Sequence, residues 1–317
     1  RNLLARFVAV LCVAAGMAAQ AADRPLNVAV LENSPPMSFR DDTGRLTGFS
    51  AEIARALCEE MQVRCEFQVT LLGRLLDALA GGEFDIVYIT RFGVAGHVLS
   101  HIADHASQAR RIINIADLHF LRQIRDAMRA GDATLMREAL TTRETEIAVL
   151  SRAELILSYS SVEQAVITSH VTTGPKAAIL PWVVDPIPLR APFAARSGIA
   201  FLGGYRHYPN VHAVQFFANE VMPLLRTRLP GVPFLVYGSN VPPEIDALAS
   251  DDVIIKGFVA DVAGIFDSAR LVVAPLLTGA GMKGKVLDYI AHGIPSVLSP
   301  VAAEGIGIRD GGEALIA

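Results

Sequence analysis

The sequence predicts an α/β protein with parallel sheets, divided into two domains. Short β-branched and aliphatic runs alternate with amphipathic stretches, which is the pattern of a sheet covered by helices. Hydrophobic residues make up 52% of the chain and charged residues 19%, so the chain has enough apolar side chains for a sizeable core. Its 317 residues correspond to about two domains of ordinary size.

The predicted strands are short, and most neighbours are far enough apart for a helix between them. They cover residues 26–31, 63–69, 85–89, 111–116, 155–158, 178–180, 199–202, 233–237, 253–256, 271–274 and 296–299. Helices are predicted at 117–129, 137–148, 162–168, 209–226 and 284–291. Ser160 and Glu163 match the S-x-x-E pattern of a capping box directly after a predicted strand, although this pattern also occurs by chance.

The first 22 residues predict a secretory signal peptide that is not part of the fold. Arg1 and Arg6 give a basic start, an apolar run follows at 7–19, and the small residues at 19–22 fit an A-x-A cleavage site. The alternative is a membrane anchor, but the uncharged run is shorter than the ~20 residues that a span needs. We expect no transmembrane span once the signal is cleaved, because no other stretch reaches that length without charges.

A proline cluster predicts the boundary between two Rossmann-like sheets that meet at a cleft. Pro186, Pro188 and Pro192 lie within residues 185–198, and proline continues neither a helix nor a central strand. No repeat and no low-complexity tract interrupts the chain on either side.

Charge and cysteine content exclude several classes of protein. The formal net charge of −4 excludes a broadly basic nucleic-acid binder, which needs surplus lysine and arginine to neutralise phosphates. Three cysteines are too few for a disulfide-dense small scaffold. No Cys/His cluster has zinc spacing, so no metal site is expected.

Residues 25–90 resemble the first half-lobe of periplasmic solute-binding proteins for polar amino acids. The phrases that carry the resemblance are LNVAV at 26–30, SPPMSF at 34–39 and DTGRLTGF at 42–49, followed by a helix at 51–61. The resemblance implies a disulfide between Cys58 and Cys65, with a pair of buried thiols as the alternative. The chain departs from the family at Ser50, where aspartate is usual, and after Ile89, and no second lobe follows.

Residues 82–317 resemble GT-B glycosyltransferases, with a group 1/4-like donor domain. The phrases are FDIVYITR at 84–91, ADLHFLR at 116–122, FLGGYRHYPN at 201–210, KGFVAD at 256–261, APLLTGAGMKGK at 274–285 and AEG at 303–305. The resemblance implies a solute-binding-protein-like β-α-β-α-β segment at 23–90 joined to an acceptor-side Rossmann-like domain at 91–190. A nucleotide-sugar donor domain follows at 197–317, and the family pattern implies that it is incomplete at its C-terminus.

A glycosyltransferase must hold a nucleotide diphosphate, and two glycine-rich segments suit this task. Gly203 and Gly204 follow a strand and precede a helix, so backbone N–H groups can approach phosphates there, with His207 nearby. The second segment, 278–285, carries two lysines and leads into a helix. Its candidate binding residues are Gly279, Gly281, Lys283 and Lys285. The alternatives are an ordinary strand–helix turn and a solvated basic loop.

Four acidic or histidine residues complete the predicted site. Asp288 stands where the family usually has a glutamate that contacts the ribose, while Ala280 occupies the position of an earlier glutamate. Glu304 follows the last strand at the edge where α/β ligands bind. His119 and Asp117 are the candidate catalytic residues on the acceptor side, because a histidine there can bind the acceptor or move a proton. A structural role is the alternative for each of them.

Three functional hypotheses follow from the sequence. The first is a glycosyltransferase that moves a sugar from a nucleotide-diphosphate donor to an unknown acceptor, with a retaining, metal-independent mechanism and no cofactor besides the nucleotide-sugar co-substrate. The second is a periplasmic polar amino-acid-binding protein that serves an ABC transporter permease. The third is an inactive chimera. Export through a signal peptide conflicts with the first hypothesis, because sugar nucleotides are cytoplasmic.

Overall fold

The computed structural model describes residues 25–31, 38–70, 74, 77–78, 81–82, 84 and 86–317. The predicted signal peptide at 1–22 lies outside the described residues. The chain divides into two compact units. The first comprises the described residues up to 115 together with 146–158 and 167–180, and the second comprises 116–145, 159–166 and 181–317. Within the described ranges, no helix is long and apolar enough to cross a lipid bilayer.

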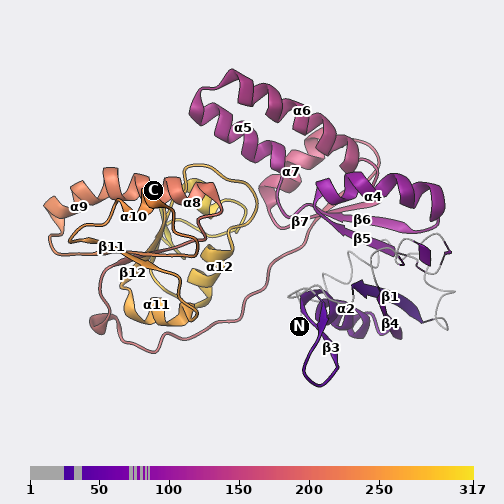
Figure 1. The fold of residues 1–317 in the computed structure, drawn as a ribbon, viewed down its shortest axis with the longest axis horizontal. Helices are drawn as coiled ribbons and strands as arrows, with labels where there is room; N and C mark the ends of the chain where they lie inside the picture. The colour runs from indigo at the N-terminus through magenta and orange to yellow at the C-terminus, as the bar shows by residue number, and fades with distance from the viewer. Residues whose placement is uncertain are drawn as a thin grey trace. The chain divides into compact units, whose positions relative to one another are not determined.

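The first unit contains a four-stranded parallel sheet with its strands in chain order (Figure 1). The strands are β5 (Ile86–Thr90), β6 (Arg110–Asn114), β7 (Leu155–Ser158) and β8 (Lys176–Ile179). Parallel neighbours need long crossovers, which helices supply here. These helices are α4 (Phe92–His105), α5 (His119–Ala130), α6 (Ala133–Leu150) and α7 (Ser161–His170). Of these, α5, residues 133–145 of α6 and residues 161–166 of α7 belong to the second unit. Buried Ile89, Ile113 and Ile156 contribute to the core of this sheet.

The N-terminal segment forms a separate small sheet in the same unit. Its strands β1 (Leu26–Leu31) and β4 (Cys65–Thr70) pair in parallel, and the helix α2 (Phe49–Glu60) lies between them in the chain. The strands β2 (Phe39–Arg40) and β3 (Leu46–Thr47) form an antiparallel pair. In the part of the chain that is described, no ladder joins β1 or β4 to the four-stranded sheet, so the segment does not extend that sheet.

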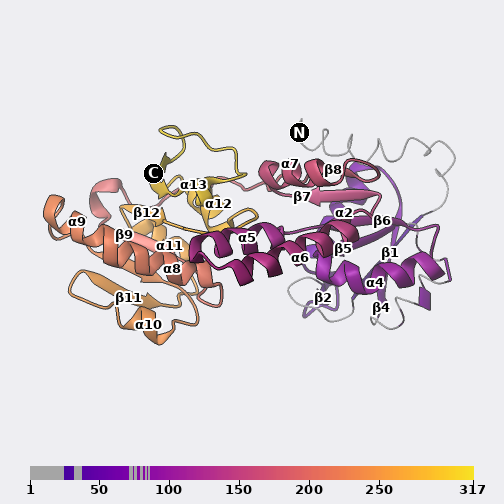
Figure 2. The ribbon, with the colours of Figure 1, turned by 90° about the horizontal axis from the view of Figure 1, so that it is seen from above.

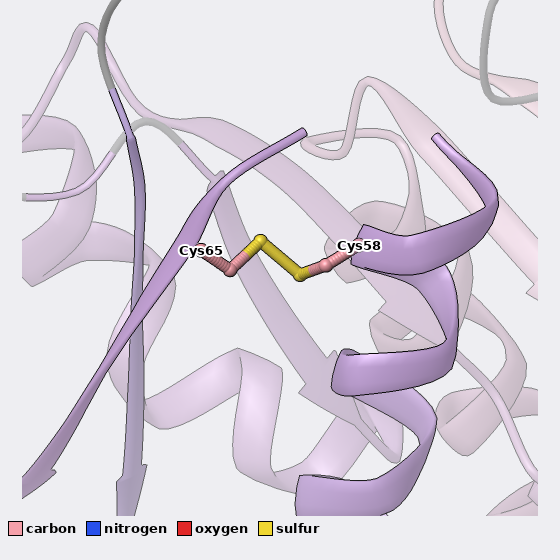
Figure 3. The surroundings of a disulfide bond; sticks show 2 residues. All are labelled: Cys58 and Cys65. Atoms are coloured by element: carbon pink, nitrogen blue, oxygen red, sulfur yellow. A yellow bond between two sulfur atoms is a disulfide. The ribbon is translucent and has the colours of Figure 1, made fainter. Parts of the chain in front are cut away.

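The predicted disulfide is confirmed. Cys58 near the end of α2 and Cys65 at the start of β4 are bonded, with 6.2 Å between their Cα atoms (Figure 3). This separation lies within the range that a disulfide spans without backbone movement. The bond ties the helix to the strand that pairs with β1.

We expect the double substitution Cys58→Ala/Cys65→Ala to lower the free energy of unfolding by about 2–3 kcal/mol, because the bond restricts a short loop of the unfolded chain. Urea unfolding of oxidised wild type and the variant, followed by circular dichroism, measures this difference. Reduced wild type serves as the control and should match the variant. Equal midpoints for the oxidised protein and the variant would contradict the prediction.

Six parallel strands form the sheet of the second unit, in the order β11-β10-β9-β12-β13-β14. They are β9 (Ile199–Leu202), β10 (Phe234–Tyr237), β11 (Val253–Gly257), β12 (Leu271–Ala274), β13 (Ser296–Leu298) and β14 (Leu315–Ile316). The chain runs outward from β9 to β11 and then returns to β12 on the other side of β9. The β9–β12 pair is therefore a topological switch point, and ligands of open α/β sheets bind at the carboxyl ends of such strands.

Helices cover both faces of this sheet, and the core lies between the layers. They are α8 (Tyr208–Phe216), α9 (Met222–Arg228), α10 (Pro243–Asp246), α11 (Val262–Ser268), α12 (Gly284–Ala291) and α13 (Pro300–Ala303). Figure 1 shows α8 and α9 on one side of the sheet and α11 on the other, and Figure 2 shows the same unit turned by 90°. Phe201, Phe234, Phe266 and Tyr289 are fully buried between strands and helices.

The long helix predicted at 209–226 is interrupted in the structure. A π-helical turn, Phe217–Val221, separates α8 from α9. Pro223 follows the turn at the start of α9, and proline has no N–H with which to continue the ladder of the preceding helix. The segment 181–192 contains no helix or strand, as the prolines there predict.

Candidate functional site

Two loops meet at the switch point of the second unit. One follows β9 and contains Gly203 and Gly204, and the other follows β12 and covers residues 275–283. The sequence brings these loops together because β9 and β12 are neighbours whose carboxyl ends share one edge of the sheet. Both glycine-rich segments predicted from the sequence therefore lie at the same place.

Gly203 needs to be a glycine because two polar side chains pack against its α-carbon. A Cβ atom at this position would lie 2.8 Å from Asn210 Cγ and 2.9 Å from Lys285 Nζ. The Gly203 N–H donates to the Tyr237 carbonyl at 3.1 Å, which joins the turn to the end of β10. The turn thus holds backbone, amide and ammonium groups within contact distance of one another.

Lys285 is held at the start of α12 by two contacts. Its Nζ donates to Asn210 Oδ1 at 2.6 Å and lies 4.3 Å from the centre of the Phe201 ring. Asn210 in turn donates from Nδ2 to the Gly204 carbonyl at 2.8 Å, so the amide is fixed at both ends. Burial lowers the pKa of Lys285 to about 7. In the part of the chain that the structure describes, no carboxylate forms an ion pair with this ammonium group.

A cavity of about 300 Å³ lies along the carboxyl ends of β11, β10 and β9 and reaches α12. Its lining residues are Leu202, Gly203, Gly204, Asn210, Gly238, Ser239, Phe258, Val259, Val262 and Lys285. Phe258, Val259 and Val262 follow β11, so the end of the cavity at the edge of the sheet is apolar. The end at the switch point carries Lys285, Asn210 and the Gly203–Gly204 turn.

Lys283 does not line this cavity but is folded back onto its own loop. It is 8% exposed, and its Nζ donates to the Gly281 carbonyl at 2.8 Å. Burial lowers the pKa of Lys283 to about 8, and the Arg125 charge acts in the same direction, while Glu304 and Glu163 raise it. Of the two predicted phosphate lysines, the structure therefore places only Lys285 at the cavity.

Gly281 packs against the start of α5 in a left-handed conformation. Its φ is +69°, and a Cβ atom would lie 2.9 Å from Asp117 Cβ and 3.1 Å from the Ala116 carbonyl oxygen. The Gly281 N–H donates to Glu163 Oε1 at 2.8 Å, and the Leu118 N–H donates to the same oxygen at 2.8 Å. Burial raises the pKa of Glu163. The fully buried Glu163 thus joins the loop to the segment before α5.

We expect Gly281→Ala to destabilise the protein by about 2–3 kcal/mol, because the added methyl group clashes with Asp117 and has an unfavourable φ. The matched control is Gly307→Ala, where φ is +79° but no atom lies within 4 Å of the added Cβ. The control should cost only about 1–2 kcal/mol, the strain of a left-handed residue. Chemical unfolding of both variants separates clash from strain, and equal losses would refute the predicted clash.

Glu304 and Gly279 are both held by Arg125 of α5. The Arg125 guanidinium donates to both carboxylate oxygens of Glu304, at 2.9 and 2.7 Å, and Nη1 also donates to the Gly279 carbonyl at 2.6 Å. Both side chains are largely buried, with 25% and 18% exposed. The sequence predicts that Glu304 contacts the nucleotide-sugar donor. In this structure its carboxylate is bonded to Arg125 instead.

The two candidate catalytic residues lie at the start of α5. His119 is the first residue of the helix, and Asp117 precedes it with its Oδ2 3.5 Å from Arg122 Nε. His207 precedes α8. Burial lowers the pKa of His207, with Arg122 and Lys285 acting in the same direction and Asp117 and Asp126 opposing them. Charged residues of α5, and Asp117 before it, thus affect the pKa of a histidine in the turn that follows β9.

Asp288 lies on the exposed side of α12, outside the residues that line the cavity. Although the residue is exposed, neighbouring atoms partly shield its carboxyl group from water, which raises its pKa, and the His292 charge opposes this. The described residues contain no group of three or more His, Cys, Asp or Glu side chains that could hold a metal ion.

Three residues of the site were not among the predicted ones. Asn210 is the last residue of the segment FLGGYRHYPN. Its position at the start of the helix after the glycine turn is the sequence feature that could have marked it as a site residue. Glu163 was predicted only as part of a capping box; Ser160 Oγ does accept from the Glu163 N–H at 3.4 Å, but the carboxylate bonds to Leu118 and Gly281. Nothing local in the sequence marks Arg125.

Two family models match separate parts of the chain, as the two resemblances predicted. Residues 196–317 match the model of glycosyl transferases group 1. Residues 26–91 match the model of bacterial extracellular solute-binding proteins, family 3. The two matches do not overlap, and together they leave residues 92–195 outside either model.

Two solved structures share the fold over most of the chain. HepE from Anabaena, solved in complex with UDP, matches with a TM-score of 0.56 and 12% identity, covering 92% of this chain and 85% of that one. Sucrose-phosphate synthase from Thermosynechococcus elongatus matches with a TM-score of 0.58 and 14% identity, covering 95% and 77%. The fold is thus mixed α/β with parallel sheets, and it resembles the folds of these proteins.

Two curated relatives match a short stretch of the chain. An L-arginine-binding protein from Pseudomonas aeruginosa is 36% identical over 21% of this chain and 26% of its own length. An octopine-binding periplasmic protein from Rhizobium meliloti is 30% identical over 25% of this chain and 26% of its own length. The chain therefore spans about a quarter of the length of the curated relatives it matches.

Proposed function

We propose that the protein is a glycosyltransferase that uses a nucleotide-diphosphate sugar. The observation that carries the proposal is the partly buried Lys285 beside the Gly203–Gly204 turn, at the switch point of a domain that matches group 1 glycosyl transferases. A buried ammonium without an anionic partner is costly, and a diphosphate supplies the missing charge. HepE was solved with UDP, which supports the same class of donor.

In the proposed binding mode, the donor lies along the cavity. Its switch-point end offers Lys285 and the Gly203–Gly204 turn to the diphosphate, and Gly279 and Gly281 belong to the loop that leads to Lys285. The N–H groups of Gly203 and Gly281 already donate to Tyr237 and Glu163, so they are not counted among the proposed phosphate contacts. The other end of the cavity offers Phe258, Val259 and Val262 to the nucleobase, and an aromatic ring exposed at 72% is available for stacking. Asp288 is proposed for the ribose hydroxyls.

In the proposed transfer, positive charge stabilises the diphosphate as it leaves. Lys285 contacts the phosphates directly, and Lys283 adds its charge from the adjoining loop. We infer a retaining transfer without metal or further cofactor, in which a donor phosphate oxygen helps to take up the acceptor proton. His119 and Asp117 then bind the acceptor or relay its proton. The acceptor itself is not specified by these residues.

The protonation of Lys285 gives the proposal a pH dependence. Its pKa near 7 means that raising the pH removes the charge that the diphosphate needs. We expect the affinity for UDP-glucose to fall by up to about tenfold per pH unit above pH 7. The two esterified phosphates of this probe do not titrate there, so the change belongs to the protein. Calorimetry on wild type and Lys285→Met measures it, and an equally steep profile in the variant would contradict it.

The experiment that tests the function is a donor screen with the full chain. UDP-, GDP- and ADP-sugars are incubated with the protein, and release of the free nucleoside diphosphate is followed with and without a panel of sugar and lipid acceptors. Turnover that disappears in Lys285→Ala supports the proposal. No binding of any nucleotide at millimolar concentration by a folded protein would refute the donor site.

The N-terminal segment carries a second proposal, that the chain is exported. The observations that favour it are the match of residues 26–91 to extracellular solute-binding proteins and the Cys58–Cys65 disulfide, which is typical of oxidising compartments. Export requires the proposed signal peptide, and N-terminal sequencing of periplasmic protein tests its cleavage at residue 22.

Binding of a polar amino acid is the alternative activity of this segment. Calorimetric titration of arginine into the full chain separates it from the transferase. Sequencing the gene across residues 65–95 tests the third possibility, an inactive chimera, which predicts a join there and neither activity.

A further inference from the structure

The loop that follows β12 is held by a buried carboxylate from a distant part of the chain. Glu163 of α7 is completely buried, and its Oε1 accepts two hydrogen bonds of 2.8 Å, from the N–H groups of Leu118 and Gly281. One oxygen therefore fixes both the segment that leads into α5 and the centre of the glycine-rich loop.

The N–H and the carbonyl group of Gly281 link Glu163 to Lys283. While the Gly281 N–H bonds to Glu163, its carbonyl accepts from Lys283 Nζ at 2.8 Å. Only a glycine fits the left-handed turn against Asp117 that lets both groups point to their partners. α12 begins at Gly284, directly after these residues, with Lys285 in its first turn. Displacement of Gly281 would therefore shift the start of the helix that carries Lys285.

We propose that Glu163 is a positioning residue for the donor diphosphate: it fixes residues 279–283, and through them the first turn of α12, in the conformation that binds phosphates. This inference rests on the proposed function. The residue acts as a hydrogen-bond acceptor of a given reach, and its charge is not required. Arg125 gives the same loop a second attachment through the Gly279 carbonyl.

Two substitutions of Glu163 separate the effect of its side-chain length from the effect of its charge. Glu163→Gln keeps the reach of Oε1 and removes the charge, whereas Glu163→Asp keeps the charge and shortens the side chain by one methylene group. Glu154→Ala is the matched control, because Glu154 also accepts a backbone N–H, that of Arg111, but it belongs to the first unit, whereas the loop and Glu163 belong to the second. All variants are made in the full chain.

The first measurement is amide hydrogen exchange of the ligand-free protein over peptides that cover 276–285. We expect roughly tenfold faster exchange in Glu163→Asp, and rates within about threefold of wild type in Glu163→Gln and Glu154→Ala. The second measurement is the dissociation constant for UDP-glucose, which should rise about tenfold only in Glu163→Asp. The Glu154→Ala control should lose stability without either change.

The opposite order of the two variants, or unchanged loop exchange in Glu163→Asp, would overturn the inference. If wild type binds no nucleotide while loop exchange still follows the expected order, the donor-site proposal fails and the positioning of the loop by Glu163 stands. If wild type binds UDP-glucose and both Glu163 variants bind equally well, the donor site stands and the inference fails.

Discussion

Lys285→Ala is expected to weaken nucleotide binding by about 1.5–3 kcal/mol, which is the contribution of a hydrogen bond to a charged group. This corresponds to a dissociation constant about 10- to 150-fold higher. The reason is that Lys285 is the cation that lines the cavity, and its Nζ lies within contact distance of the Gly203 turn. Titration of UDP and GDP into the full chain measures the loss.

Lys256→Ala is the matched control for this prediction. Lys256 is an exposed lysine of β11 that does not line the cavity, so its removal changes the net charge equally and should leave affinity unchanged. Asn210→Ala should fall between the two, because it removes the group that orients the ammonium. Equal affinity in Lys285→Ala and wild type would move the phosphate contact to the Gly203–Gly204 turn and His207.

Gly238→Ala should produce the largest loss of stability among the single substitutions considered, about 3 kcal/mol or more. A Cβ atom at this position would lie 1.8 Å from the Gly203 carbonyl oxygen and 2.7 Å from Tyr205 Cε2. Neither group can move away easily, because Gly203 is bonded to Tyr237 and Tyr205 is buried. The ends of β9 and β10 would therefore have to separate.

The control for Gly238→Ala is Gly264→Ala in α11. A Cβ at Gly264 would meet Asp261 Oδ2 at 3.6 Å, an ordinary contact, so alanine should keep or raise stability by about 0.5–1 kcal/mol in this helix. Urea unfolding followed by far-UV circular dichroism compares the two. A loss at Gly238 no larger than the change at Gly264 would show that the strand ends adapt.

Much of the fold could be predicted because its signals are local. The strands at 155–158, 199–202 and 271–274 and the helix at 284–291 have the predicted bounds. β-branched and aliphatic runs reveal buried strands within a few residues, and the disulfide joins cysteines only seven positions apart. The interruption after Phe216 was missed, because a long apolar periodicity concealed the effect of Pro223 on the hydrogen-bond ladder.

The sequence by itself determined the places of the two glycine-rich turns and the residue types in them, because close backbone approach requires glycine wherever the chain is. The tertiary structure decided which polar groups meet. It pairs Arg125 with Glu304 across 179 positions, Gly281 with Glu163 across 118 and Lys285 with Asn210 across 75. No short window contains both partners of such a pair, and their meeting depends on the strand order, which places β12 beside β9. For this reason two lysines that look equivalent in the sequence differ, with Lys285 at the cavity and Lys283 bonded within its loop.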